Sequence, residues 1–318
     1  MHSFKKQFLS SHSSFSRAIQ YLKANLQEGK AHRPSKFKIM KFVFLCGANR
    51  DNGTRISLRR EELLKFIDTN FPYIKVFIAE EIFDLLKKEG HSGNILDIED
   101  EISKFADEIV IVLESSSAFC ELGAFATKGL RPKLIIINEE THKQKQSFIN
   151  LGPLQAIKET SGGKKRILHY KMDYSSKSVP DSIGQIFSAL KKVLQSIPIE
   201  KPGTIHFDTF DPKKSFGKDT MRFIHDLIFF SEPIRRKEII EILKALFGPG
   251  EYKRITNLLG LLRAISLVEM KGPENYQYYV SKEGKELLNY KFNLDFIISS
   301  FRNYPQKHTQ ERFHDIKA

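Results

Sequence analysis

Tryptophan is absent from the 318 residues, and only two cysteines occur, Cys46 and Cys120. Their spacing does not match a zinc or redox motif, so we expect two small buried side chains and no metal site. No apolar run reaches the length of about 18 residues that a membrane-spanning helix needs. The N-terminus also lacks the continuous apolar stretch of a signal peptide. We therefore expect a cytoplasmic protein with no membrane partner.

The G-x-G-x-x-G fingerprint of dinucleotide-binding folds is also missing, because Gly47 and Gly53 are too far apart. Its absence excludes the tightly wrapped pyrophosphate of a dehydrogenase. The loop that begins at Gly47 still follows a buried strand, at the place where phosphate or sugar groups dock in α/β sheets. We predict Gly47, Asn49 and Arg50 as substrate-binding residues. A guanidinium suits a phosphate, and a surface salt bridge is the alternative for Arg50.

Acidic residues are too few to balance the basic ones: 51 Lys and Arg against 38 Asp and Glu give a net charge of +13. Such a surplus favours a polyanionic partner, nucleic acid before membrane, although many basic proteins bind neither. Residues 1–40 contain one acid, Glu28. Apolar residues in this arm recur at helical spacing, at Phe15, Ile19, Leu22 and Leu26. We expect this helix to pack on a domain, with self-association or docking on nucleic acid as alternatives.

Five apolar stretches alternate with helical patterns between residues 41 and 200. They lack polar alternation, as strands do when both faces of a parallel sheet are covered. The alternation predicts a doubly wound, flavodoxin-like α/β sheet. We expect a polar excursion over residues 139–165, which could cover a site as a lid. The predicted strands are 42–46, 76–79, 109–113, 134–138 and 167–170.

The stretch 109–125 contains the most informative pattern in the chain. A five-residue apolar strand runs into Glu114 and three serines, and a helical pattern with Glu121 in its first turn follows. In an open parallel sheet this is the carboxyl edge, where ligands bind. We predict Glu121 as catalytic, with Ser115 and Ser117 as substrate-binding residues. The alternative is structural, because a glutamate near a helix start favours the dipole and serines are common caps.

Two acidic features near this strand receive structural interpretations. Residues 97–101 form an acidic cluster that could bind a cation, but we expect a solvated helix face. Asp107 precedes the strand at the amino edge of the sheet, away from the predicted site. We therefore expect a structural role for Asp107, such as in a turn, rather than a catalytic one.

Proline and glycine between residues 201 and 215 indicate a linker. Three helical patterns follow, then two short strands around Gly272-Pro273 and a further helix that starts at residues 282–288. Three helices and a hairpin predict a smaller winged helix-turn-helix domain, residues 216–318, with a C-terminal helix. Many winged helices bind only protein, and that alternative stays open. The predicted nucleic-acid-binding residues are Lys253, Arg254, Arg263 and Lys271.

Part of this pattern resembles a known family. The motif Ala106-Asp107, the strand 109–113, the serines 115–117 and the run 121–126, Glu-Leu-Gly-Ala-Phe-Ala, resemble the nucleoside 2-deoxyribosyltransferase-like family over residues 41–200. The resemblance implies that Glu121 attacks or holds the sugar carbon of an N-glycosidic bond. Asn49 and Arg50 depart from the small-residue loop of that family, so the resemblance does not identify the substrate. The whole chain resembles retron-associated effectors that join such a domain to a winged helix.

The resemblance implies a toxic effector of a retron anti-phage system that arrests the growth of its host. It implies an N-glycosidase, a NAD nucleosidase or a nucleoside deoxyribosyltransferase-like enzyme, which uses NAD or a related nucleotide as substrate and needs no cofactor. The implied partners are a retron reverse transcriptase and its msDNA, a DNA–RNA hybrid, and we also expect a homo-oligomer or a higher assembly. Two alternatives stay open: a nucleotide-sensing DNA-binding regulator without catalysis, and base transfer between deoxynucleosides.

Overall fold

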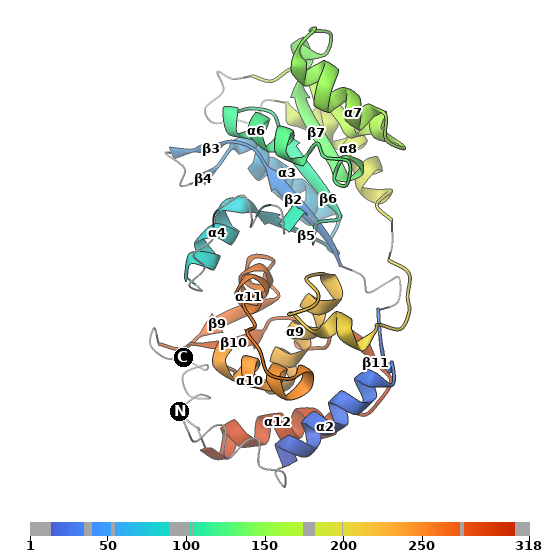
Figure 1. Ribbon diagram of the computed structural model, residues 1–318. Helices are drawn as coiled ribbons and strands as arrows, with labels where there is room; N and C mark the ends of the chain where they lie inside the picture. Colours follow the sequence, from blue (N-terminus) through green and yellow to red (C-terminus); the bar gives the residue numbers. More distant parts are fainter. Residues whose placement is uncertain are drawn as a thin grey trace. The chain divides into compact units, whose positions relative to one another are not determined.

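The computed structural model describes residues 14–34, 40–51, 55–88, 94, 99, 102–103, 105–173, 182–198, 200–273 and 277–308 (Figure 1). The chain divides into two compact units. One, here called the α/β unit, holds residues 39–83 and 93–199. The other, here called the helical unit, holds residues 1–38, 84–92 and 200–318. The four-part division of the chain made from its sequence stays a prediction.

The α/β unit is built on a five-stranded sheet in which every neighbouring pair is parallel, in the order β5-β2-β6-β7-β8. This arrangement confirms the predicted doubly wound, flavodoxin-like fold. The strand order reverses between β2 and β6, since the chain goes from β2 outward to β5 and then returns to β6. The strands are β2 (Lys41–Cys46), β5 (Ile74–Ile78), β6 (Glu108–Val112), β7 (Leu134–Glu139) and β8 (Ile167–Tyr170).

Helices cover both faces of this sheet, which explains why its strands are apolar without alternation. On one face, the strand residues pack in a single core with α3 (Leu58–Asn70) and α8 (Phe187–Gln195). On the other face, Phe44 of β2 contacts Phe125 of α6 (Ser116–Phe125) with ring centroids 5.9 Å apart. The unit also contains the start of α4 (Ala79–Lys88) and the short hairpin of β3 (Asn49–Arg50) and β4 (Arg55–Ile56).

The segment between β7 and β8, where we expect a polar excursion, consists of short helical turns. Its elements are η4 (Glu140–His142), the π-helical turn η5 (Asn150–Leu154), α7 (Gln155–Lys158) and η6 (Gly163–Arg166). Pro153 inside η5 removes a backbone donor, and a wider turn tolerates that loss. Leu154 and Ile157 are buried, so this segment packs on the α/β unit. A role as a lid stays a prediction.

The helical unit contains the predicted order of three helices and a hairpin. The central helix α9 (Lys218–Ser231) is buried along most of its length. It is followed by α10 (Arg236–Phe247), α11 (Ile255–Ala264) and the antiparallel pair of β9 (Val268–Lys271) and β10 (Tyr278–Ser281). This order confirms the predicted winged helix-turn-helix arrangement.

The expected N-terminal helix is α2 (Ser14–Gln27), and it packs within the helical unit, where α2 and α12 lie side by side (Figure 1). Phe15 meets Phe301 of α12 (Asp295–His308) with ring centroids 4.7 Å apart. The next residues form β1 (Ala31–His32), which pairs with β11 (Asn289–Tyr290). Ile205 and Phe210, in the segment predicted as a linker, are both buried.

The helix expected to start at residues 282–288 is absent, and that prediction is wrong. The buried carboxylate of Asp226 accepts hydrogen bonds from the backbone N–H groups of Leu287 and Leu288, at 2.7 and 3.0 Å. It also accepts one from the Tyr290 hydroxyl at 2.9 Å. These contacts hold the backbone in the short strand β11, because a buried carboxylate needs such donors. Within the described part of the chain, no helix has both the length and the apolarity to cross a membrane.

Candidate functional site

The predicted site residues of the α/β unit lie on the segments that leave the carboxyl ends of β2 and β6. These two strands are neighbours at the point where the strand order reverses. In doubly wound sheets, loops separate at this point and ligands bind outside the strand ends. The first loop begins at Gly47, and the second contains Glu114 and Ser115. The topology therefore brings both predicted loops to one edge of the sheet.

Glu121 lies on α6, but not in the first turn as expected, because the helix begins at Ser116 and contains no acid in that turn. The helix dipole therefore does not account for it, since its effect fades beyond the first turn. Its Oε2 atom is buried and has no hydrogen-bond partner among the described residues. Burial, with the nearby charges of Glu99 and Glu80, raises the pKa of Glu121 to about 8, against the opposing effect of Arg60.

The neighbours of Glu121 are mostly acidic. Burial raises the pKa of Glu99, and the charge of Glu80 raises it further. The thiol of Cys46 at the end of β2 has a raised pKa because it is buried and because Glu121 is near. Glu121 thus forms no ion pair with a described residue, and its surroundings disfavour its ionised form. Such perturbed groups are frequent at functional sites.

Arg60 on α3 is the cation of this region, and sequence reasoning missed it. Its side chain is completely buried. It donates to Glu80 through Nη1 and Nη2, at 3.0 and 2.9 Å. It also donates to the carbonyl of Leu45 at 2.9 Å and to Oδ1 of Asn49 at 2.9 Å. Arg60 therefore ties the end of β2, the loop after it and α4 together.

The pKa of Glu80 shows how strongly this ion pair is held. Burial alone would raise the pKa of Glu80, but the hydrogen bonds and charge of Arg60 outweigh burial and hold it below its usual value. Glu80 therefore stays ionised at neutral pH. The charge of Arg60 is used in this pair, which leaves the carboxyl group of Glu121 only weakly compensated.

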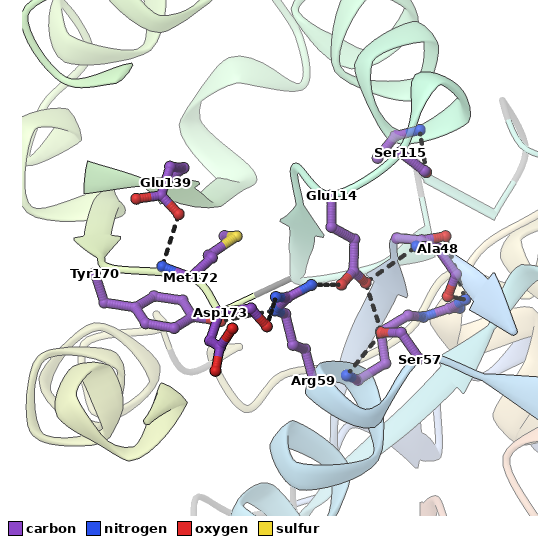
Figure 2. A network of polar contacts seen from close by, with 12 residues as sticks. Ala48, Ser57, Arg59, Glu114, Ser115, Glu139, Tyr170, Met172 and Asp173 are labelled. Carbon is purple, nitrogen blue, oxygen red and sulfur yellow. Dashed lines mark hydrogen bonds and ion pairs between the residues drawn. The ribbon is translucent and has the colours of Figure 1, made fainter. Parts of the chain in front are cut away.

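A second network holds the loop after β2 against the loop after β6 (Figure 2). The side chain of Glu114 is 2% exposed. It accepts hydrogen bonds from the Ala48 backbone at 3.1 Å, from Ser57 Oγ at 2.5 Å and from Arg59 Nη1 at 2.8 Å. Arg59 continues to the hydroxyl of Tyr170 at 3.1 Å, so the network reaches the end of β8. The carboxylate of Glu114 thus holds three segments of the carboxyl edge together.

The sequence contains one indication that Arg59 and Arg60 have partners far away in the chain. Arg59 and Arg60 stand in the first turn of α3, where their charge opposes the helix dipole. Such a placement indicates tertiary partners, which here are Glu114 and Glu80. For Glu114 the sequence pattern indicates only a place in a turn.

The other predicted substrate-binding residues have structural partners of their own. Arg50 is ion-paired with Glu61, which is the alternative considered for it. Oδ1 of Asn49 accepts from Arg60. Ser115 caps α6 by accepting from the Ala118 backbone at 3.3 Å, and its Oγ lies 2.9 Å from that of Ser117. Their roles in binding a substrate stay predictions.

Three minor expectations have clear outcomes. Cys46 is buried as expected, but Cys120 is exposed on α6, and that expectation was wrong. Asp107 has a structural role as predicted, but not in a turn: its side chain accepts from the backbone N–H of Phe42 in β2 at 2.8 Å. Of the acidic cluster 97–101, only Glu99 is described, and it is buried rather than solvated. Within the described ranges, no group of three His, Cys, Asp or Glu residues could hold a metal ion.

The four predicted nucleic-acid-binding residues lie on α11, on β9 and just before α11. Lys253 pairs with Glu251 at 2.9 Å, and both are exposed. Lys271 pairs with Glu269 at 3.3 Å. Arg254 is exposed, and Arg263 is half-buried on α11. Most side chains of α11 are buried, so this helix presents few groups to a partner.

Gly47 is required by the close approach of the two networks, and we predict a large cost for a side chain there. Its φ is +153°, and an added Cβ would lie 3.0 Å from Cδ of Arg60 and 3.1 Å from Oε1 of Glu114. Gly47→Ala is expected to lower the free energy of unfolding by about 1–3 kcal/mol. Urea denaturation measures this.

The matched control is Gly123→Ala, in α6, where an added Cβ meets nothing within 4 Å. Because glycine is a poor helix former, this change is expected to stabilise by about 0.5–1 kcal/mol. Equal unfolding free energies for Gly47→Ala and the unmodified protein would show that the loop can move away from Arg60 and Glu114.

Comparison with known proteins adds a biological context. The family described as "STM3845 retron effector protein" matches residues 55–270. "Retron Ec73 putative ribosyltransferase/DNA-binding protein" of Escherichia coli is 40% identical over 304 residues, 93% of this chain and 94% of that protein. "Retron Ec86 putative ribosyltransferase/DNA-binding protein" of Escherichia coli is 33% identical over 141 residues, 44% of each chain.

These names correct one expectation. Both relatives are named for ribosyl transfer, which is a different reaction from the N-glycosidase chemistry of a NAD nucleosidase. The predicted enzyme class is therefore wrong. The family match covers more than half of the chain, and the relative from retron Ec73 is similar over nearly the full length of both proteins. The chain belongs to the STM3845 retron effector family.

Proposed function

We propose that the α/β unit transfers a ribosyl group from a donor with an N-linked base to an acceptor, with Glu121 as the residue that meets the sugar carbon. The observation that carries this proposal is the half-buried side chain of Glu121, whose buried Oε2 atom has no hydrogen-bond partner among the described residues. Its place beside the reversal of strand order supports a binding role. The names of the relatives support transfer as the reaction class.

The chemistry follows from the charge that develops on the sugar. As the bond between C1 and the base nitrogen breaks, its electron pair leaves with the base and positive charge grows on C1. The ionised carboxylate of Glu121 stabilises that charge or forms a bond to C1. An acceptor then attacks C1, and the carboxylate is released. A pyridinium base such as nicotinamide leaves neutral and needs no acid, which suits NAD or a related nucleotide as donor.

Arg60 and Glu114 have positioning roles in this proposal. Arg60 holds the loop after β2 through Asn49, and Glu114 holds the same loop through the Ala48 backbone. The cations of the two networks do not serve a substrate phosphate, because Arg59 is paired with Glu114 and Arg60 with Glu80. Glu121 therefore contacts the reacting carbon, and the networks of Arg60 and Glu114 hold the loops that shape the site.

We further propose that this transfer is the toxic output of a retron system that defends against phage. The family supports the retron association. A reverse transcriptase and its msDNA would restrain the activity, and self-association into a homo-oligomer or a higher assembly is part of the same proposal. The helical unit, with its winged-helix arrangement, would make the nucleic-acid contact that the relatives' names state for those proteins.

Base exchange tests the transfer directly. The purified chain is incubated with NAD and labelled nicotinamide, and separately with deoxynucleosides and labelled adenine. We expect the label to enter the nucleotide or nucleoside, because a sugar held at Glu121 can return to a new base. If no donor acquires label while the protein is folded and binds duplex DNA tightly, the proposal fails and a DNA-binding regulator without catalysis is favoured.

A further inference from the structure

The most exposed apolar side chains of the described residues lie together after β7. Phe148 is 85% exposed and Leu151 is 69% exposed. The other exposed large apolar residues, Tyr73 and Phe296, reach only 40% and 39%. A single exposed apolar residue is ordinary, but two that lie one helical turn apart form a surface feature. Phe148 in particular presents most of its ring to solvent.

Exposed lysines lie near this feature along the chain and after the neighbouring strand β8. Lys143 and Lys145 precede Phe148 and are exposed, and Lys171 is exposed directly after β8. Glu139 of β7 is paired in register with Tyr170 of β8. The chain segments after these two residues therefore leave the same edge of the sheet side by side. We call Lys143, Lys145, Phe148, Leu151 and Lys171 the β7–β8 surface.

The lysines of the β7–β8 surface are available to an anion. None of its three lysines forms an ion pair with a residue that the structure describes. The pKa of His169 on β8 is sensitive to nearby lysines. Burial lowers its pKa, and Lys143 and Lys158 lower it further, whereas Glu140 opposes them. Lys143 and Lys158 therefore lie near enough to the end of β8 to act on His169, and Glu140 opposes them there.

Two lysines predicted to bind nucleic acid in the helical unit differ from these lysines, because they are ion-paired. Lys253 and Lys271 each have a glutamate within ion-pair distance, at 2.9 and 3.3 Å. A lysine that keeps an acidic partner must give it up before it binds a phosphate. The lysines of the β7–β8 surface have no ion pair to break before they bind a phosphate. The three lysines of the β7–β8 surface are therefore more readily available to a phosphate than Lys253 and Lys271 are.

We propose that the β7–β8 surface binds single-stranded nucleic acid. Lysines on phosphates with an exposed ring beside them are the two components of single-strand recognition. The ring of Phe148 can stack on an unpaired base, which a duplex does not offer. Charge complementarity selects the phosphate backbone, and the exposed aromatic ring selects a strand whose bases are unpaired. This site is additional to the winged helix and does not depend on the proposed transfer reaction.

Fluorescence anisotropy with the full chain tests this proposal, using a labelled oligothymidylate of about 20 nucleotides and a duplex of similar length. Phe148→Ala is expected to weaken single-strand binding roughly tenfold, because base stacking on an aromatic ring is lost. Its affinity for the duplex should not change. The triple variant Lys143→Gln/Lys145→Gln/Lys171→Gln is expected to reduce the slope of log affinity against log salt by about 2 for the single strand.

Tyr73→Ala is the matched control, because Tyr73 is an exposed aromatic residue of the same unit at 40%. It should bind both probes like the unmodified chain. Thermal melting checks that each variant is folded, which is expected because every changed side chain is exposed. Unchanged single-strand affinity in Phe148→Ala together with an unchanged salt slope in the triple variant would overturn the proposal. That result would leave the β7–β8 surface as a contact for protein.

Discussion

Glu121→Gln is expected to abolish ribosyl transfer, lowering kcat/KM by at least about 10³-fold, because the group that stabilises positive charge on C1 is lost. An amide keeps the size of the carboxyl group but cannot carry its negative charge. Base exchange with labelled nicotinamide or adenine measures the loss. Cys120→Ser is the control, since Cys120 is the exposed neighbour of Glu121 on the same helix. This control should retain full activity.

The dependence of transfer on pH follows from the same residue. The pKa of Glu121 is raised to about 8, so the carboxyl group is mostly protonated at neutral pH. A carboxylate that acts on C1 must be ionised. The value of kcat/KM should therefore rise with pH through about 8 and level off above it. A profile that is flat between about pH 6 and pH 9 would contradict the assignment of Glu121 to the reacting carbon.

The stability of the protein should change with pH in the opposite direction to kcat/KM. Between about pH 5 and pH 8 the folded state keeps a proton on Glu121 that the unfolded chain has lost. The free energy of unfolding should therefore fall as pH rises through this window, by up to about 1.4 kcal/mol per pH unit, or about 4 kcal/mol in total. Glu121→Gln has no such proton and should lack this fall. Urea denaturation across the window separates loss of catalysis from loss of fold.

Arg60→Met is expected to cause the largest loss of stability, about 3–5 kcal/mol, because it leaves Glu80 charged and partly buried without its partner. Arg60 is completely buried and donates to the Leu45 carbonyl, to Asn49 and to Glu80. Methionine fills part of the space but donates no hydrogen bond. Thermal and urea denaturation measure the effect.

Arg50→Met is the matched control for Arg60→Met. Arg50 is also ion-paired, with Glu61, but both side chains keep more than a quarter of their surface exposed, at 28% and 29%. Solvent screens such a pair, so the expected loss is less than about 1 kcal/mol. The double variant Arg60→Met/Glu80→Gln should recover part of the stability, because it removes the unpaired charge. Similar losses for Arg50→Met and Arg60→Met would contradict the central place given to Arg60.

The sequence alone determined the five strands of the sheet and the order of helices in the helical unit. Uninterrupted apolar stretches such as residues 109–113 predict strands buried on both faces, and their alternation with helices predicts the doubly wound sheet. The N-terminal helix was also predictable, because Phe15, Ile19, Leu22 and Leu26 share one face. These patterns are local: periodic burial leaves a periodic trace in the sequence.

Only the tertiary structure decided which charged groups meet. Glu114 contacts Arg59, and Arg60 contacts Glu80, because the parallel topology brings the ends of separate strands and helices to one edge. The same applies to Asp226, which holds residues 287 and 288 out of a helix through contacts more than 60 positions away in the chain. Periodicity carries no record of such pairings, since a charged side chain looks the same in the sequence whether it is solvated or buried against a distant partner.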